Sequence, residues 1–421
     1  MSTDSPSSPR AVAIIGGGGF IGRHLRAALD AAGHRVTTPG RSDFDLVRDN
    51  AATLAAALAG QEVVINAAGL VRGRRGNSME AVHADGTERL IRACRAVGVP
   101  RLIHLSALGA SLDGPNLYQR TKGHGEAQLA NSQDLDCCVL RPSVVIGRGG
   151  ASTALFSTLA VLPHPPRIGP GCWTVQPVHV DDLAALVVRL VSLDGPLPRR
   201  INVVGPEPTT TDDLTATLRA WMGLPPRRHL PVPEPLLATA AAIGDRLRAG
   251  PVNRETLAML KAGNTADPAP FTAILGRAPL ALPLALARHP ASDADQLHSR
   301  LYVLRPVLRW SLALLWIATG LLSFGLHPLE GSHRLLASVG LQGPLADLAL
   351  FGGAGLDLTL GLLLLARWRP VAVGGAMLAS MAAFTIIACG LPLDHWTHPF
   401  APLLKNLPIA AATLTMMAME A

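Results

Sequence analysis

Tyr118 and Lys122 lie four positions apart in the stretch YQRTKGHGE, residues 118–126, of a chain of 421 residues that contains only two tyrosines. If residues 117–130 form a helix, the two side chains share one face. A lysine ammonium group lowers the pKa of a neighbouring phenol, and such a phenol can exchange a proton with a substrate oxygen while a hydride moves. Ser106 ends a predicted strand upstream, and its hydroxyl can polarise the same oxygen. We therefore predict Ser106, Tyr118 and Lys122 as catalytic residues; the alternative is a surface helix with an ordinary tyrosine.

A glycine-rich loop lies near the start of the chain. The stretch GGGGFIG, residues 16–22, has the spacing G-x-x-G-x-x-G and lies between the apolar run AVAII and a segment of helical spacing that stops at Gly33. Glycine lets the backbone turn tightly and approach a pyrophosphate, and the following helix offers free N–H groups and the positive end of its dipole. The loop predicts a dinucleotide site, with a plain glycine-rich turn as the alternative. The predicted cofactor residues here are Gly16, Gly19, Phe20, Ile21 and Gly22. Lys122 is also a predicted cofactor residue, because its ammonium group can hold the nicotinamide ribose.

The end of the second predicted strand indicates which dinucleotide binds. Sites for NAD usually carry an acidic residue there, about 20 residues after the loop, which binds the ribose hydroxyls. The sequence reads VTTPGRS, without an acid, and Arg41 follows the turn. Because arginine suits a 2′-phosphate, we predict NADP(H). Asp43 or Asp45 can still reach a ribose or an adenine, so NAD(H) stays open and Asp45 is also a predicted cofactor residue.

Short apolar runs alternate with segments of helical spacing in the first half of the chain. The runs that read as strands are AVAIIGG (11–17), HRVTTPG (34–40), EVVINAAG (62–69), RLIHLSALG (101–109), LDCCVLRPSVVIG (135–147) and RRINVVGP (199–206). This alternation predicts an α/β Rossmann fold, a doubly wound parallel sheet, over residues 11–225. Residues 226–300 are rich in proline and alanine, and we predict a small helical cap and a connector. Residues 1–10 are predicted to be a disordered tail, without the apolar stretch of a signal peptide.

Several motifs in order resemble the short-chain dehydrogenase/reductase superfamily: the glycine loop, NAAG (66–69), Ser106, the Tyr118–Lys122 pair and RPSVVIG (141–147). VHVDDLAALV (178–187) and INVVGPEP (201–208) are similar to its extended and atypical branches, which include the NAD-dependent epimerase/dehydratase group and proteins similar to the 39-kDa subunit of respiratory complex I. The resemblance covers about residues 11–290 and implies a Rossmann fold with the pyrophosphate at the three loop glycines. It further implies that the cofactor lies along Ala67, Ala68 and Gly69, with its nicotinamide near the backbone of Pro142 and Ser143.

Two positions depart from the pattern of this family. The family often has asparagine where AVHADGT carries His83, which leaves a proton relay through that helix open. Sugar-nucleotide dehydratases of the group carry an acidic residue directly after the serine or threonine that ends the strand, whereas this chain reads SALGA from Ser106. The second departure argues against dehydration and leaves simple redox chemistry or epimerisation.

Four apolar segments follow residue 300, at about 307–326, 345–366, 370–391 and 403–419. Each is close to the ~20 residues that a helix needs to cross a bilayer, so we predict an all-α four-helix transmembrane bundle; a buried soluble bundle is the alternative. Basic residues precede the first segment and join the second to the third. The positive-inside rule then places the Rossmann domain and the C-terminus in the cytoplasm, in a multi-pass protein of the cytoplasmic (inner) membrane.

The predicted membrane domain, residues 301–421, resembles the DoxX-like family of four-helix membrane domains in LRWSLALLWIATGLLS, GAGLDLTLGLLLL and HPFAPLLKNLPIAAA. That family is linked with quinone-related redox chemistry in some bacteria. Asp357 falls near the middle of the second segment, where a charge is costly and functional by default; an aspartate that holds helices together is the alternative. His395, His398 and Lys405 are predicted at the far interface, as a solvated loop or as a site.

Composition narrows the function. The net charge is +7, but aromatic residues make up 4% and no basic block stands out, so we predict no nucleic-acid partner. The five cysteines show no metal-ligand spacing, and no metal is predicted. We predict a membrane-anchored NAD(P)(H)-dependent oxidoreductase acting on an apolar carbonyl, alcohol or quinone-like lipid at the bilayer. The alternatives are a non-catalytic assembly factor or redox sensor for a membrane protein complex, and an NAD-dependent epimerase.

Overall fold

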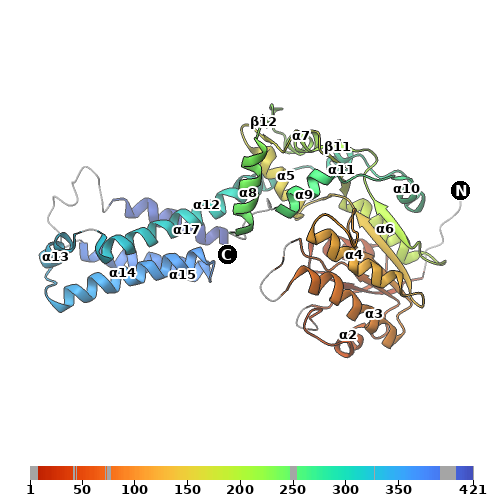
Figure 1. The fold of residues 1–421 in the computed structure, drawn as a ribbon, viewed down its shortest axis with the longest axis horizontal. Helices are drawn as coiled ribbons and strands as arrows, with labels where there is room; N and C mark the ends of the chain where they lie inside the picture. The colour runs from red at the N-terminus through yellow and green to blue at the C-terminus, as the bar shows by residue number, and fades with distance from the viewer. Residues whose placement is uncertain are drawn as a thin grey trace. The chain divides into compact units, whose positions relative to one another are not determined.

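The computed structural model describes residues 8–40, 43, 45–71, 73, 77–246, 254–326, 328–388 and 404–420. The chain divides into two compact units, residues 1–299 and 300–421, and Figure 1 shows the elements of both. The predicted catalytic residues all belong to the first unit.

The first unit is built on six strands in the order β2–β1–β3–β4–β5–β10, all parallel. They are β1 (Ala11–Ile15), β2 (Arg35–Thr37), β3 (Val63–Asn66), β4 (Arg101–Leu105), β5 (Asp136–Pro142) and β10 (Arg200–Val203). The order reverses at β1, because β2 adds to one side of it and β3 to the other. Ligands of such sheets bind at the carboxyl ends of the strands at this reversal. The predicted doubly wound parallel sheet is confirmed.

Helices cover both faces of this sheet. They are α1 (Phe20–Ala31), α6 (Val180–Ser192) and α10 (Ala269–Leu275) on one face, and α2 (Ala51–Leu58), α3 (Gly86–Val97) and α4 (Leu117–Ala130) on the other (Figure 1). Leu25, Leu183 and Phe271 belong to the core of the first face, and Leu54 and Leu90 to that of the second. Because the central strands are buried on both faces, their sequences are continuous apolar runs. Polar side chains are therefore concentrated where the strands end.

The remaining elements of the first unit flank the sheet. They are α5 (Ala151–Val161), α7 (Thr211–Trp221), α8 (Glu234–Arg246), α9 (Arg254–Ala262), α11 (Leu282–Ala287), the π-helix η1 (Ala81–Asp85), and the short strands β6 (Val145–Ile146), β7 (Pro166–Arg167), β8 (Thr174–Val175), β9 (Val178–His179), β11 (Thr209–Thr210) and β12 (Leu230–Pro231). Phe156, Leu214 and Leu282 form a separate apolar cluster between α5, α7 and α11. The segment predicted as cap and connector, 226–300, is helical in part, and its helix α10 packs into the main core. Residues 1–7 of the predicted tail lie outside the described residues.

The second unit consists of helices. They are α12 (Asp293–Leu321), which begins in the first unit, the π-helix η2 (Leu322–Leu326), α13 (Leu329–Ser338), α14 (Pro344–Leu365), α15 (Pro370–Ala388) and α17 (Asn406–Glu420). In the part of the chain that the structure describes, three helices are long and apolar enough to cross a membrane, at 293–325, 344–365 and 370–387. Three predicted segments fall on them. The fourth, 403–419, holds α17, which has 15 residues, and remains a prediction as a span.

The polar residues predicted in this unit are only partly described. Asp357 lies within α14 and is partly buried, and its role remains a prediction. His395 and His398 lie outside the described residues. Lys405 is exposed, directly before α17.

Three arginines meet one carboxylate in the second unit. The Glu420 side chain, 1% exposed, lies 2.9 Å from Arg305, 2.6 Å from Arg309 and 3.4 Å from Arg367. Arg305 and Arg309 belong to α12, Arg367 follows α14, and Glu420 ends α17. One negative charge among three positive ones leaves this end of the helices basic, as the positive-inside pattern of the sequence requires.

Candidate active site

The glycine loop joins β1 to α1 at the reversal of strand order. Gly16 has a φ of +80°, and a methyl group on its Cα would lie 2.8 Å from the Ala68 nitrogen; both features require glycine. Gly22 is packed as closely, since a methyl group there would overlap the Gly16 oxygen. Gly19 caps α1 without a side-chain hydrogen bond, and the first turn of α1 has no acidic residue. This loop and helix N-terminus suit a pyrophosphate.

The turn after β3 lies against the glycine loop. Asn66 Oδ1 accepts a hydrogen bond from the Ala68 N–H at 3.2 Å, which fixes the turn. One residue further, a methyl group on Gly69 would lie 3.4 Å from Lys122 Nζ. The structure therefore brings together the glycine loop, the 67–69 segment and Lys122, which the sequence predicts to meet the cofactor.

Lys122 is buried in α4, with 4% of its surface exposed. Its Nζ donates a hydrogen bond to Leu105 O at 2.7 Å, one residue before Ser106. Burial lowers the pKa of Lys122 to about 8, and the Glu126 carboxylate opposes this shift. The lysine is thus fixed at the end of β4 and titrates close to neutral pH.

Tyr118 is the second residue of α4 and is partly buried. Its ring meets the ring of His83 edge-on, with the centroids 5.6 Å apart. Burial raises the pKa of Tyr118 to about 12. The predicted lowering of this pKa by Lys122 is therefore wrong for this structure, because the loss of solvent around the phenolate is the larger effect. The phenol is protonated at neutral pH and can donate a proton.

Ser106 follows β4 and is 4% exposed. Its N–H donates to Leu140 O at 2.8 Å, whereas its Oγ has no hydrogen-bond partner among the described residues. A buried hydroxyl without a partner is costly and calls for an explanation. An oxygen of a bound substrate supplies such a partner, so Ser106 fits its predicted role.

Two residues of the glycine loop that the sequence predicts to bind the cofactor have side chains that pack against other parts of the protein. Phe20 lies against the turn after β6, since a methyl group on Gly147 would be 3.2 Å from its ring. Ile21 packs against the core of the α1 face. Their part in cofactor binding remains a prediction.

The polar groups of the segment that ends β5 are hydrogen-bonded to other parts of the protein. Pro142 O accepts from the Leu108 N–H at 2.9 Å. Ser143 donates its N–H to Val203 O at 3.0 Å and its hydroxyl to Asn264 O at 3.2 Å. These bonds fix the backbone that the resemblance places near a nicotinamide, and that placement remains a prediction.

The residues predicted to choose between NADP(H) and NAD(H) are described only in part. Arg41 lies outside the described residues. The Asp45 carboxylate accepts a hydrogen bond from the Val47 N–H at 2.9 Å and lies 3.8 Å from Arg48 Nε. Asp45 thus stabilises its own turn, and a contact with the ribose remains a prediction.

A buried polar layer beneath the site is not predicted by the sequence. Asn66 Nδ2 lies 3.1 Å from His104 Nδ1, and both side chains are 1% exposed. His83, noted in the sequence only as a departure from the family, lies in the same layer with both ring nitrogens hydrogen-bonded. Histidines within otherwise apolar strand and helix segments were the available signal.

Glu255 of α9 is a further residue that the sequence did not reveal. Its carboxylate oxygens lie 3.4 Å from the N–H groups of Leu117 and Tyr118, in the first turn of α4. A carboxylate at this position satisfies free N–H groups and complements the helix dipole. The predicted cap thereby contacts the helix that carries Tyr118.

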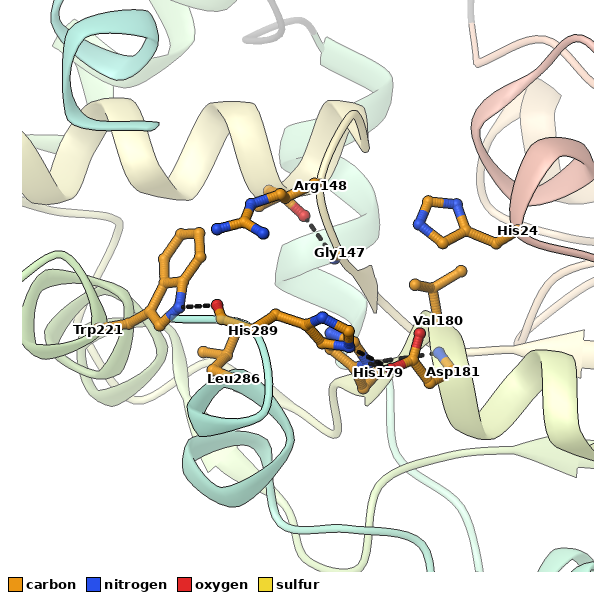
Figure 2. Close-up of a pocket in the computed structure, with 10 residues that line it drawn as sticks. His24, Gly147, Arg148, His179, Val180, Asp181, Trp221, Leu286 and His289 are labelled. Carbon is orange, nitrogen blue, oxygen red and sulfur yellow. Dashed lines mark hydrogen bonds and ion pairs between the residues drawn. The ribbon is translucent and has the colours of Figure 1, made fainter. Parts of the chain in front are cut away.

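A cavity of about 110 Å³ lies elsewhere in the first unit (Figure 2). Its lining includes His24, Arg148, His179, Trp221 and His289. None of the predicted catalytic residues lines it. The predicted site at the strand ends is therefore distinct from this cavity.

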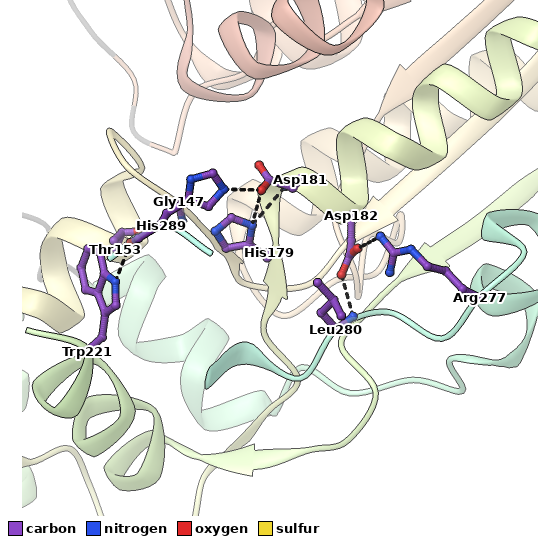
Figure 3. Close-up of polar contacts among 9 residues, drawn as sticks. All are labelled: Gly147, Thr153, His179, Asp181, Asp182, Trp221, Arg277, Leu280 and His289. Carbon is purple, nitrogen blue, oxygen red and sulfur yellow. Dashed lines mark hydrogen bonds and ion pairs between the residues drawn. The ribbon is translucent and has the colours of Figure 1, made fainter. Parts of the chain in front are cut away.

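The VHVDDLAALV motif fixes the chain that follows α10 (Figure 3). The Asp181 carboxylate lies 2.6 Å from His289 Nε2 and 3.4 Å from His179 Nδ1, and these contacts lower the pKa of Asp181. Asp182 pairs with Arg277 and accepts from the Leu280 N–H at 2.8 Å. The two aspartates therefore hold the segment around residues 277–289 against α6, which is a structural role.

Together, the fold and the apolar helices indicate a nucleotide-binding domain of the short-chain dehydrogenase/reductase type in a membrane protein. Residues 12–204 match the NAD dependent epimerase/dehydratase family, and residues 313–414 match the DoxX-like family. The chain thus joins an epimerase/dehydratase-family domain to a DoxX-like membrane domain, as the resemblance predicts.

Curated relatives match over more than half of the chain. The chain is 27% identical over 257 residues to NADH dehydrogenase [ubiquinone] 1 alpha subcomplex subunit 9 of Arabidopsis thaliana, covering 55% of this chain and 62% of the subunit. It is 29% identical over 259 residues to ceramide reductase of Caulobacter vibrioides, covering 58% of this chain and 80% of the reductase. The chain thus spans less than two thirds of the plant subunit.

Solved structures agree on the fold. UDP-glucuronic acid 4-epimerase from Bacillus cereus, in complex with UDP-glucuronic acid and NAD, superposes with a TM-score of 0.51 at 17% identity, covering 69% of this chain and all of the epimerase. At this identity the likeness shows the fold alone.

Proposed function

We propose that this chain is a membrane-anchored NAD(P)(H)-dependent oxidoreductase that moves hydride to or from an apolar carbonyl or alcohol, including quinone-like lipids. The buried Lys122 ammonium group, held at Leu105 O beside the unpaired Ser106 hydroxyl, carries the proposal. Burying a charge and leaving a hydroxyl unpaired both cost stability. Nucleotide binding alone can use the buried lysine but not the unpaired Ser106 hydroxyl, and active sites are where such costs are retained.

Each residue of the site has a role in this proposal. When bound, the nicotinamide supplies or accepts the hydride. The Tyr118 phenol donates a proton to the substrate oxygen during reduction and takes it back during oxidation. The Ser106 hydroxyl donates a hydrogen bond to the same oxygen. The Lys122 ammonium group stabilises the phenolate that forms when the proton leaves Tyr118.

Three observations support an apolar substrate. The DoxX-like domain belongs to a membrane family, so the site is tethered near lipid. Leu112 and Leu117, which precede Tyr118, are 49% and 41% exposed. A relative that matches 58% of the chain is named ceramide reductase. Each supports a lipid or lipid-like substrate without identifying it.

We further propose NADP(H) as the preferred cofactor and the cytoplasmic side of the inner membrane as the location of the first unit. The cofactor preference rests on the missing acid in VTTPGRS and on Arg41. The orientation rests on the basic cluster of Arg305, Arg309 and Arg367 and on the positive-inside rule.

A second candidate is a nucleotide-binding assembly factor or redox sensor of a membrane complex. The relatives named as NADH dehydrogenase subunits favour it. Epimerisation is a third candidate, favoured by the family match.

Deuterium transfer tests the proposal. Full-length protein in detergent receives NADPH or NADH deuterated at the transferable C4 position, together with a ceramide oxidised to its 3-ketone, a short-chain quinone or another apolar ketone. Mass spectrometry then follows the label. Label on the carbinol carbon of a reduced ketone supports the oxidoreductase. For a quinone the hydroquinone itself is quantified, because its new O–H hydrogens exchange with water and carry no label. Tight nucleotide binding without transfer to any acceptor contradicts it and favours the second candidate.

A further inference from the structure

His83 links the turn after β3 to the catalytic helix. The side chain is buried, with 1% of the residue exposed. On one side of its ring, Nε2 lies 3.0 Å from the backbone nitrogen of Leu70, which follows Gly69. On the other side, Nδ1 lies 2.9 Å from Thr121 Oγ1. The Thr121 hydroxyl in turn donates to Tyr118 O at 3.1 Å. One imidazole ring thus connects the predicted cofactor turn with the first turn of α4.

The donors determine where the ring carries its proton. Leu70 contributes an N–H group, so Nε2 must accept, and the neutral ring therefore carries its hydrogen on Nδ1. That hydrogen is donated to Thr121. Burial, followed by the Lys122 charge, lowers the pKa of His83 to about 2. A neutral ring with both nitrogens engaged has no free position for passing a proton to a third group.

The backbone around His83 is fixed as firmly as its ring. The Thr87 hydroxyl donates to His83 O at 2.7 Å. A methyl group on Gly125 would lie 2.5 Å from the same oxygen, so α4 packs directly on the π-helix η1. The ring also meets Tyr118 edge-on. Single π-helical turns are frequent at functional sites, and this one points His83 at the catalytic helix.

We infer that His83 is a positioning residue for the reaction and not part of a proton relay. Its Nδ1–H sets Tyr118 through Thr121, and its Nε2 sets the turn at Leu70 that continues the cofactor surface of Gly69. The inference rests on the proposed function, because it concerns the same tyrosine.

Two substitutions separate the two ring nitrogens. In His83→Asn the amide nitrogen takes the place of Nδ1, which keeps a donor for Thr121 but loses the acceptor for Leu70. In His83→Gln the amide oxygen takes the place of Nε2, which keeps the acceptor for Leu70 but loses the donor for Thr121. Thr121→Val removes the second link while His83 is left intact. His124→Asn is the matched control, since His124 is exposed on the same helix.

The full-length protein in detergent is assayed for NADPH affinity, and for NADPH oxidation with the acceptor that accepts deuterium. A lost buried hydrogen bond corresponds to roughly tenfold or more in an equilibrium or a rate. We expect His83→Asn to weaken NADPH binding about tenfold with kcat within about threefold. We expect His83→Gln and Thr121→Val to lower kcat about tenfold with NADPH affinity within about threefold. The pH dependence of kcat/KM stays the same in all of them.

Three results would overturn the inference. The first is an equal loss of NADPH affinity and kcat in all three variants, and the second is variants that behave like His124→Asn. The third is a pH profile of kcat/KM that changes in His83→Asn, which a proton relay through His83 requires. Thermal unfolding confirms that each variant is folded, and Thr121→Val keeps the test valid if both His83 variants unfold. Tyr118→Phe, assayed alongside, distinguishes failure of the proposed function from failure of the inference about His83. If Tyr118→Phe retains turnover, the proposed function fails. If Tyr118→Phe is the only variant that loses turnover, only the role of His83 fails.

Discussion

Lys122 keeps an ammonium group where burial opposes the charge. Its pKa of about 8 lies below the ordinary value of a lysine, so the group loses its proton as the pH rises through 8. If reduction needs the ammonium group beside the Tyr118 phenolate, kcat/KM for reduction is constant below about pH 7 and falls up to about tenfold per unit above pH 8. A pH–rate profile of kcat/KM, which reports the free enzyme, measures this.

Lys122→Arg provides the control for that profile. Arginine stays protonated over the whole range, so the variant has a lower kcat but no fall between pH 7 and 9. An unchanged fall in Lys122→Arg would mean that another group causes it. Stability follows the same shift with the opposite trend: between about pH 8 and 10.5 the unfolded chain binds more protons at Lys122, so the folded state gains stability as the pH rises.

The sequence points to candidate catalytic residues but not to their surroundings. Tyr118 and Lys122 can be found because their spacing is local to one helix. The acceptor of Lys122, Leu105 O, and the contacts of His83 with Leu70 and Thr121 join segments that are distant in the chain. The direction of the Tyr118 pKa also depends on burial, which local spacing does not reveal.

At the scale of elements, the loop between β1 and α1 contains glycines that the fold needs and one glycine that faces open space. A methyl group on Gly18 has no atom within 4 Å apart from its chain neighbours. We expect Gly18→Ala to fold like the wild type and to weaken NADPH binding at least about tenfold, because the methyl group occupies space that the pyrophosphate needs. Thermal unfolding and NADPH fluorescence titration measure the two effects.

Gly16→Ala is the contrasting variant. With a φ of +80° and the Ala68 nitrogen 2.8 Å from the new methyl group, it destabilises the unit by about 1–3 kcal/mol through backbone strain and overlap. If Gly18→Ala binds NADPH as tightly as the wild type, the pyrophosphate does not lie over this loop.

The element order was predictable because it depends on local pattern. Buried parallel strands read as apolar runs, and the helices between them have an apolar stripe. Two features were not predictable in this way. Phe271, in the segment read as a cap, packs into the core under the sheet, and Asp182 reaches Arg277. Both depend on how a proline-rich segment returns to the sheet, which periodicity does not encode.

At the scale of the whole molecule, Cys172 reports the side of the membrane. Of the four cysteines in the described residues, it alone is exposed. If the first unit is cytoplasmic, a membrane-impermeant maleimide added to intact bacterial cells leaves Cys172 unmodified, and the same reagent modifies it after lysis. Cys172→Ser identifies the signal, since Cys389 lies outside the described residues. Modification in intact cells that disappears in Cys172→Ser would contradict the predicted orientation.

At the same scale, the proposed function is a redox enzyme whose substrate comes from the lipid phase. Such an enzyme performs chemistry at Tyr118 and does not only bind a nucleotide beside it. The most direct test compares wild type and Tyr118→Phe as full-length protein in detergent, measuring NADPH affinity and NADPH oxidation with an accepted apolar acceptor. We predict that Tyr118→Phe retains nucleotide affinity within about threefold and loses at least about 100-fold in kcat, the scale of general acid catalysis. Equal turnover in the two proteins would contradict the account.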